Sequence, residues 1–242
     1  METVSHIALA HQTSLNRRMS VISHNLANLN TTAYRREDLM FEEVLRETQD
    51  GETGNISMVQ DVSSFFKLES GPMESTGNPL DVAINGDGYF TVETEDGPRY
   101  TRDGSFMINA DNELVTKEGR AVLDAQGNVI DMPENGGRIE IARDGTVSTP
   151  DEDLGQLGVV TFENEQALKK RPDSLYDPED MNPQPAENPE IHQGMLEGAN
   201  IQGITEMTNM MDVVRSYQGA KKMMDQDHER QLRAIRTLVS TQ

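Results

Sequence analysis

The chain has 242 residues, only 35% of them hydrophobic and 5% aromatic, and it carries a formal net charge of −21 without any Cys. So lean a composition argues against one dense core through the whole length, and the missing Cys excludes disulfides, thiolate catalysis and sulfur-ligated metals. The charge lies between the ends, because residues 1–49 sum to −1 and residues 200–242 to +1, so no basic stripe is left for a nucleic acid.

The first fifty residues contain neither Gly nor Pro, and their apolar positions recur mostly every three or four residues, which predicts an amphipathic helix. The stripe comprises Val4, Ile7 or Ala8, Leu15, Met19, Ile22, Leu26 and Leu29. His11 falls on it and is expected to be buried or half-buried, because no second ligand accompanies it. The Asn-rich run 28–32 suits a helix end and a turn. Residues 1–36 are thus predicted as an N-terminal helix and turn, followed by a connecting segment, 37–74.

Between residues 75 and 170 the apolar period changes to two, which is typical of strands. Six short runs show this alternation, at 80–84, 89–92, 99–101, 113–116, 138–141 and 157–162. Turns containing Gly separate them, at 85–88, 96–98, 125–128 and 144–145. This region is predicted to be a compact β domain. Residues 171–199 contain five Pro within eighteen positions and are expected to form an extended return segment on the surface.

The last segment, 200–242, has no Pro and carries one apolar stripe, which predicts a second helix. The stripe comprises Met207, Met210, Val214, Tyr217, Met224, Leu232, Ile235 and Val239. A helix of about 38 residues spans roughly 57 Å, and so long a helix with a narrow stripe requires a partner. The predicted fold is therefore α+β, with long terminal helices packed as a coiled-coil-like stalk and a β-rich middle domain inserted between them.

Candidate chemistry along the chain is weak, and we predict no catalytic residue, no cofactor, no metal site and no small-molecule substrate. With forty-two Asp and Glu, paired carboxylates occur by chance, and the five His show no i, i+4 pair. The runs 85–88 and 111–113 share only part of a calcium-loop pattern, and turns explain both. Two alternatives stay open: a stalked β module that binds calcium or a glycan, and a hydrolase that uses the surplus carboxylates.

Export signals of the common kind are not expected either. The start Met1–His6 has an acid where a secretory signal is basic, so we expect no cleavable signal peptide. No stretch approaches the roughly 20 apolar residues of a membrane span, so membrane insertion is not expected.

Three blocks resemble the flagellar axial family of rod and hook proteins. The first runs from 23 to 36, with His24 where the family usually has Asn and Ala33 where it usually has Gly; the second covers 76–90 and 100–106; the third covers 193–201, with a helix motif at 215–217. The motif residues that we single out are Asn25, Leu26, Ala27, Asn28, Thr31, Gly77, Asn78, Pro79, Leu80, Asp81, Gly86, Gly88, Tyr100, Thr101 and Arg102.

This resemblance implies a structural, non-enzymatic subunit of the basal-body rod that polymerises through its terminal helices, transmits torque and continues the export channel. Length and the compact run from residue 65 to 81 favour a proximal-rod subunit, with distal rod or hook as the alternative. The resemblance implies a periplasmic place in the basal body, with other rod subunits and the type III export apparatus as partners. Surrounding basal-body rings are a further hypothesis, which would explain the acidic middle.

Terminal apolar residues then form the predicted assembly interface. It comprises Leu15, Ile22, Leu26, Met210, Val214, Met224 and Ile235.

Overall fold

A computed structural model of the protein describes residues 2–47, 55–133, 137–171, 173–179 and 181–239, without the side chains of 2–7, 41–62, 231, 234, 235 and 237–239. The chain divides into two units. The helical unit comprises Met1–Ala27, Arg36–Lys67 and Ile201–Gln242, and the β unit comprises Asn28–Arg35 and Leu68–Asn200. The β unit is thus interleaved with the helical unit along the sequence.

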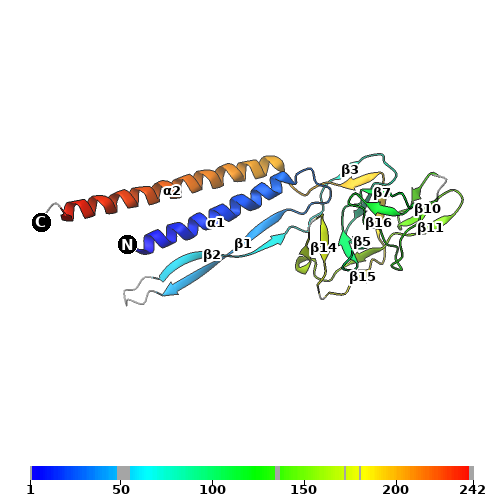
Figure 1. Cartoon of the computed structure of the whole chain (residues 1–242), viewed down its shortest axis with the longest axis horizontal. Helices are drawn as coiled ribbons and strands as arrows, with labels where there is room; N and C mark the ends of the chain where they lie inside the picture. Colours follow the sequence, from blue (N-terminus) through cyan, green and yellow to red (C-terminus); the bar gives the residue numbers. More distant parts are fainter. Residues whose placement is uncertain (1, 48–54, 134–136, 172, 180, 240–242) are drawn as a thin grey trace. The chain divides into compact units, whose positions relative to one another are not determined.

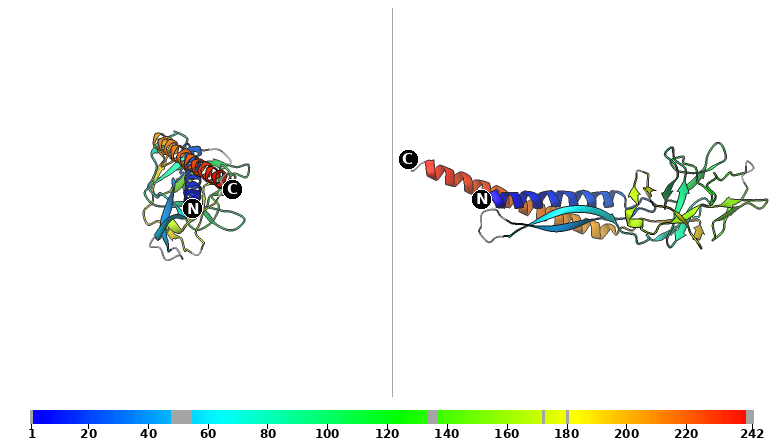
Figure 2. Two further views of the ribbon diagram at one scale, coloured as in Figure 1. Left: turned by 90° about the vertical axis from the view of Figure 1, so that its left-hand side faces the viewer. Right: turned by 90° about the horizontal axis from the view of Figure 1, so that it is seen from below.

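The helical unit contains two helices, α1 (Glu2–Ala27) and α2 (Gly203–Val239), and two strands, β1 (Glu37–Glu47) and β2 (Asn55–Phe66). The helices lie side by side, and the antiparallel β1–β2 hairpin packs against α1 (Figures 1 and 2). The hairpin register runs from Glu37 opposite Phe66 to Glu47 opposite Asn55, with a shift between Met40 and Phe41. The surface of α1 is therefore shared between a helix and a hairpin.

The predicted coiled-coil-like stalk is wrong, although helices do form at both ends. Among the side chains that the structure describes, the buried apolar cluster of this unit contains Leu15, Ile22 and Val213, with Met19, Met210 and Tyr217 packed partly against it. A coiled coil needs an apolar seam sustained over several heptads. The physical reason for the error is the hairpin, which occupies part of the surface of α1; residues 37–66 were expected only to connect.

The β unit is built from short antiparallel strands. Their bounds are β3 (Met73–Ser75), β4 (Val82–Asn85), β5 (Tyr89–Val92), β6 (Arg99–Thr101), β7 (Phe106–Ile108), β8 (Leu114–Thr116), β9 (Glu140–Ile141), β10 (Thr146–Ser148), β11 (Asp153–Gln156), β12 (Val159–Thr161), β13 (Lys169–Lys170), β14 (Leu175–Asp177), β15 (Gln184–Pro185), β16 (Glu190–Gln193) and β17 (Met195–Glu197), with a 3-10 turn at Glu165–Ala167. The largest sheet has the order β13-β14-β6-β5-β12-β15. A second sheet has the order β11-β10-β9, and β16-β4, β17-β3 and β7-β8 pair separately.

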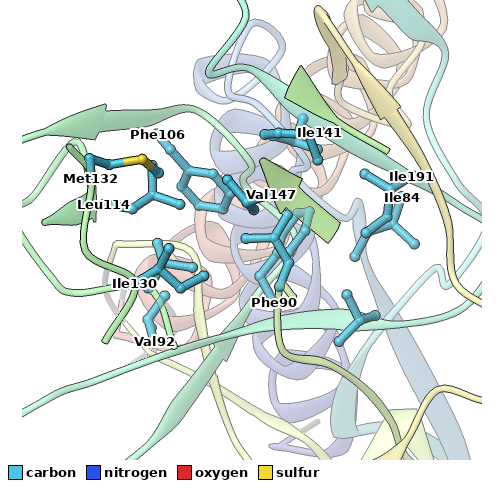
Figure 3. Close-up of a cluster of buried hydrophobic side chains, with 14 of the residues drawn as sticks. Ile84, Phe90, Val92, Phe106, Leu114, Ile130, Met132, Ile141, Val147 and Ile191 are labelled. Atoms are coloured by element: carbon cyan, nitrogen blue, oxygen red, sulfur yellow. The ribbon is translucent and has the colours of Figure 1, made fainter. Parts of the chain in front are cut away.

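Two buried clusters hold this unit together. The larger is aliphatic with two Phe rings and unites strands from 82 to 191 in sequence (Figure 3). Its members are Val82, Ile84, Phe90, Val92, Phe106, Leu114, Val122, Ile130, Met132, Ile141, Val147, Leu157, Val159, Leu175 and Ile191. The smaller cluster is aromatic: the Tyr89 ring meets Phe162 and Tyr176 edge-on, with ring centroids 5.8 and 5.2 Å apart. Such edge contacts suit the quadrupoles of the rings.

The return of the chain completes the β unit. Residues 190–193 pair with β4, and Met195–Glu197 pair with β3, so the segment after the prolines supplies two strands to the beginning of the unit. The six alternating runs of the sequence correspond to strands β4, β5, β6, β8, β9 and β12. His11, expected to be buried or half-buried, is exposed. Neither helix, over the residues that the structure describes, combines the length and apolar character needed to cross a membrane.

Candidate functional site

The motif after α1 begins with a buried amide. Asn25 is 1% exposed, its Nδ2 donates to the carbonyl of Glu37 at 2.8 Å, and its Oδ1 accepts from the N–H of Glu37 at 3.0 Å. Only an amide side chain can donate and accept in this way at once. Asn25 therefore fixes the first residue of β1 to the last turn of α1.

A turn follows the helix and ends in a left-handed residue. The N–H of Thr31 donates to the carbonyl of Asn28 at 3.1 Å, and the Thr31 hydroxyl contacts the Asn28 side chain. Ala33 has φ +55° and is buried. An L-residue rarely adopts this conformation, which explains why Gly suits the position in the resembling family.

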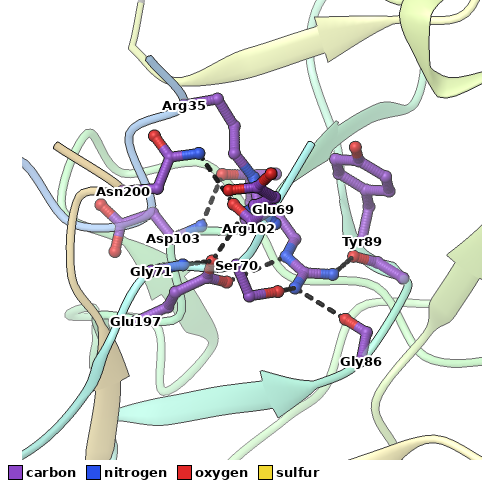
Figure 4. Close-up of polar contacts among 12 residues, drawn as sticks. Arg35, Glu69, Ser70, Gly71, Gly86, Tyr89, Arg102, Asp103, Glu197 and Asn200 are labelled. Carbon is purple, nitrogen blue, oxygen red and sulfur yellow. Dashed lines mark hydrogen bonds and ion pairs between the residues drawn. The ribbon is translucent and has the colours of Figure 1, made fainter. Parts of the chain in front are cut away.

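Three buried charges meet at the end of this turn (Figure 4). Glu197 is 2% exposed, and its two carboxylate oxygens lie 3.1 Å from Arg35 Nη1 and 3.1 Å from Arg102 Nε. The N–H of Gly71 donates a third bond to Oε1 at 2.9 Å. Arg35 also donates to the carbonyl of Glu69. We call Arg35, Arg102 and Glu197 the ionic cluster.

Arg102 extends the ionic cluster into the β unit. Its Nη1 donates to the carbonyl of Gly88 at 2.6 Å, and its Nη2 donates to the carbonyl of Gly86 at 2.7 Å and the hydroxyl of Ser70 at 3.3 Å. The guanidinium lies 5.7 Å from the centroid of the Tyr89 ring. Gly86 and Gly88, which belong to the turn between β4 and β5, are thus acceptors in a buried network. This turn joins strands of different sheets and binds an arginine of the chain itself.

Burial around the ionic cluster also affects two tyrosines. Desolvation raises the pKa of Tyr176 to about 12, although Arg35 and Arg102 nearby lower it. Desolvation likewise raises the pKa of Tyr89, and the neighbouring Glu165, which accepts its hydroxyl at 3.0 Å, adds to the effect. Both phenols therefore stay neutral at physiological pH and act as hydrogen-bond donors or aromatic packing groups.

The middle motif forms turns of defined geometry. Gly77 has φ +74°. Asn78 Nδ2 donates to Asp81 Oδ1 at 2.9 Å, and the N–H of Asp81 donates to the carbonyl of Asn78 at 3.1 Å. A Cβ on Gly88 would lie 2.9 Å from Val159. Thr101 donates to the Ser174 carbonyl at 3.2 Å. Other motif members have structural positions too: Tyr100 is in the aromatic cluster, Leu80 packs on the main core, and Pro79 accepts from Gln193.

The residues predicted as assembly interface differ in burial, over the side chains that the structure describes. Leu15 and Ile22 are buried against Val213 within the helical unit, and Met210 packs partly on the same cluster. Three others, Leu26, Val214 and Met224, are half-buried, and Ala27 next to Leu26 is exposed. The side chain of Ile235 lies outside the described residues.

A different set of apolar side chains on α2 is open to solvent. Ile204 is 84% exposed, and Met207 and Met211 are each 52% exposed. Their spacing of three and four residues places them along one side of the helix. Ile204 precedes Val213 by about two and a half turns, so this side faces away from the buried cluster. We call these three residues the outer stripe; sequence reasoning placed only Met207 of the three on an apolar stripe, because periodicity alone does not tell which side of the helix α1 covers.

The described residues contain no group of three or more His, Asp or Glu side chains placed to hold a metal ion. The run 111–113, compared above with a calcium loop, is the turn of the β7–β8 hairpin, where Asn109 Nδ2 donates to Glu113 Oε2 at 2.8 Å. Asn112 has φ +64°, a conformation that Asn tolerates. The ionic cluster was also not predicted as a site, although Arg35, Arg102 and Glu197 all lie in the blocks that resemble the axial family.

Two family models match the chain. The one described as flagellar hook protein FlgE/F/G D1 domain matches residues 83–149, and the one described as flagellar basal body rod FlgEFG protein C-terminal matches residues 192–237. They fall in the β unit, and across its last strands and most of α2, respectively.

Full-length relatives agree with these matches. The chain is 36% identical over 242 residues to the flagellar basal-body rod protein FlgF of Caulobacter vibrioides and 31% identical over 248 residues to FlgF of Rhizobium meliloti, with 98% of each chain covered in both cases. It is 32% identical to the flagellar basal-body rod protein FlgG of Bacillus subtilis, over 88% of this chain and 90% of that protein. The chain belongs to the family of flagellar basal-body rod proteins.

Proposed function

We propose that this protein is a structural subunit of the flagellar rod, in the proximal position, and that it has no catalytic activity. The outer stripe carries this proposal: three large apolar side chains are exposed near the start of α2, while Val213, on the opposite side, is buried with Leu15 and Ile22 of α1. The FlgF relatives match over 98% of their length and are named as basal-body rod proteins, which supports this place in the axis. FlgG relatives cover less of the chain, and the distal rod is the second candidate.

The outer stripe has the chemistry of a helix-packing surface. Between 201 and 211 the one charged residue is Glu206, which is 1% exposed and 2.9 Å from Arg36 Nε. The hydroxyl of Thr208 is turned back to the carbonyl of Ile204 at 2.9 Å, which satisfies it within the helix. Met side chains adapt to neighbours of different shape. Other rod subunits, related in sequence but not identical, are the partners that we propose for this surface.

Export through the flagellar type III apparatus is part of the same proposal, as is a periplasmic location within the basal body.

The β unit contains ten basic and twenty-eight acidic residues, a net charge of −18. We propose that this acidic surface faces surrounding basal-body rings and keeps them from adhering. Replacing Asp151, Glu152 and Asp153 by their amides should then slow rotation; unchanged rotation of tethered cells would contradict this part.

Assembly is tested in cells that lack the chromosomal gene. We expect basal bodies with an absent or truncated rod in electron cryotomograms, and rescue by the unaltered chain. Met207→Asp combined with Met211→Asp should be exported but fail to enter the rod. Met107→Asp is the matched control, because Met107 is 45% exposed but lies in the β unit. Complete rods without the chain, or normal incorporation of the double variant, would contradict the proposal.

A further inference from the structure

We propose that the ionic cluster is a clasp that carries mechanical force between the ends of the β unit and its β core. The role in the cell rests on the proposed function, because a rod subunit works under torque. The clasp itself depends only on contacts within the β unit, and it can be tested in the isolated protein. Neither the family match nor the motif residues assign a mechanical role to these three side chains.

Arg35 and Glu197 of the clasp, with two of their hydrogen-bond partners, lie close to places where the chain crosses between the two units. Arg35 is the last residue of the segment 28–35. Glu69 and Gly71 lie near the start of the segment 68–200, and Glu197 lies near its end. The sequence passes from one unit to the other next to each of these places. The clasp thus gathers three of the four regions where the chain enters or leaves the β unit.

Several hydrogen bonds join these regions. The N–H of Ala33 donates to the carbonyl of Glu197 at 2.7 Å, and the N–H of Asn200 donates to the carbonyl of Tyr34 at 3.2 Å. The side chain of Asn200 donates to the carbonyl of Glu69 at 2.7 Å. With the Arg35–Glu197 ion pair these bonds form a short ladder between segments that are more than 130 residues apart in sequence.

Two backbone segments approach each other closely beside the ion pairs. A Cβ on Gly71 would lie 1.9 Å from the carbonyl oxygen of Gly198, so no other residue fits there. The N–H of Gly198 donates to the carbonyl of Pro72 at 2.8 Å. The strands β3 and β17, at the two ends of the segment 68–200, pair beside this contact. Tension on one of them is therefore opposed by the other.

The clasp is also connected to the core. Arg102 binds Glu197 at one side and the carbonyls of Gly86 and Gly88 at the other. Both glycines lie in the turn directly before β5, and Phe90 of that strand is fully buried in the main core. The three charged side chains are each 2–3% exposed, and the Coulomb attraction between opposite charges rises as the surrounding dielectric falls. Force on Glu197 is therefore passed to the sheet through Arg102.

A single-molecule pulling experiment tests the clasp in the full chain. The sequence contains no Cys, so Asn30→Cys and Gln202→Cys provide unique attachment points at exposed positions on either side of the ladder. We expect the first rupture of the unaltered chain at high force. Arg35→Met and Glu197→Gln should lose that high-force event. Arg120→Met is the matched control, because its ion pair with Asp173 lies in the same unit but is exposed.

Circular dichroism and tyrosine spectra first establish that each variant is folded. If Arg35→Met does not fold, Arg35→Lys takes its place, because it retains the charge but not the two-sided contact with Glu197 and Glu69. A first rupture at the unaltered force in the folded Arg35 and Glu197 variants would overturn the clasp. An equal loss in Arg120→Met would overturn it too.

Swimming in media of increasing viscosity tests the role in the cell. Cells with Arg35→Lys should assemble rods but lose motility at lower viscosity than cells with Arg120→Lys. Equal motility of the two at every viscosity would reject the mechanical role. Absence of the chain from rods would instead reject the proposed function, while the pulling result would still decide whether the clasp exists.

Discussion

The β unit and the helical unit differ in how completely each buries its own apolar surface. The β unit encloses a cluster of fifteen apolar residues and a second one of five, and it carries a net charge of −18. The helical unit, in its described side chains, has three buried apolar residues at its core and carries a net charge of −3. Apolar burial is the main favourable term in folding, so the two units should differ in stability.

Their buried carboxylates differ in the same direction. Glu197 of the β unit is held by two arginines and a backbone N–H, whereas Glu206 of the helical unit is paired with Arg36 and leaves Oε2 without a hydrogen bond. A buried charge that is incompletely paired stabilises less. Among the described side chains, the β unit therefore buries more apolar surface and pairs its buried carboxylate more completely than the helical unit does.

The largest effect should come from opening the core of the β unit. Phe90→Ala removes a fully buried ring whose centroid is 5.1 Å from that of Phe106, and we expect a loss of about 3–5 kcal/mol in the free energy of unfolding. Four of the five tyrosines lie in this unit, so near-ultraviolet dichroism in a urea titration reports on it. Leu15→Ala should shift mainly the helical far-ultraviolet signal. If both dichroism signals shifted to the same urea midpoint in both variants, the two units would not differ in stability.

The next effect concerns the amide that fixes β1 to α1. Asn25→Ala leaves the N–H and carbonyl of Glu37 without this partner, and we expect the helical unit to lose about 1–3 kcal/mol. The hydrogen-exchange rate of the Glu37 amide measures this loss of stability. Asn16→Ala is the matched control, since Asn16 is exposed on the same helix. Equal exchange in the two variants would show that Asn25 does not hold the hairpin.

A smaller effect, of opposite sign, is expected at Ala33. Its φ of +55° is unfavourable for an L-residue, so Ala33→Gly should stabilise the β unit by up to about 1 kcal/mol. Ala83→Gly serves as the control, because Ala83 is buried in β4 outside the left-handed region and its replacement should destabilise. Thermal unfolding followed by the tyrosine signal distinguishes the two. Destabilisation by Ala33→Gly would mean that the methyl contact outweighs the strain.

The smallest effects concern the pH dependence of the β unit. Hydrogen bonds from Arg171, at 2.8 and 3.2 Å, and from the Glu179 N–H lower the pKa of Asp177, so its contribution to stability is present above the unfolded pKa of about 3.9 and is lost as the pH falls through the folded value. Asp177→Asn should therefore flatten the loss of stability below about pH 4.

Asp103 should show the opposite sign. Burial raises its pKa, although bonds from Ser105 lower it in part, so the folded state holds the proton more tightly than the unfolded chain. The contribution of Asp103 to folding stability is favourable below its pKa in the unfolded chain and is lost as the pH rises through its pKa in the folded state. Asp103→Asn should gain stability relative to the unaltered chain near neutral pH. Urea midpoints across the acidic range measure both variants; slopes of equal sign would contradict the assignment.

The sequence by itself determined the elements whose signals are local. The long periodic stripes predicted α1 and α2, and alternation around Val82, Phe90 and Leu114 predicted strands. The Gly and Asn turns were predicted because their backbone conformations, such as φ +74° at Gly77 and φ +64° at Asn112, depend on the residue itself. The matched blocks also indicated the family, which the relatives confirm.

The tertiary structure alone decided which side of each helix is covered and which charges are paired. The β1–β2 hairpin packs on part of α1, so the two helices do not form the predicted coiled coil; Ile22 of α1 is buried and Ile204 of α2 is exposed. Arg35, Arg102 and Glu197 meet although they are far apart in sequence. Strand pairing and ion pairing depend on neighbours brought together by the whole fold, and no local pattern of residues encodes those neighbours.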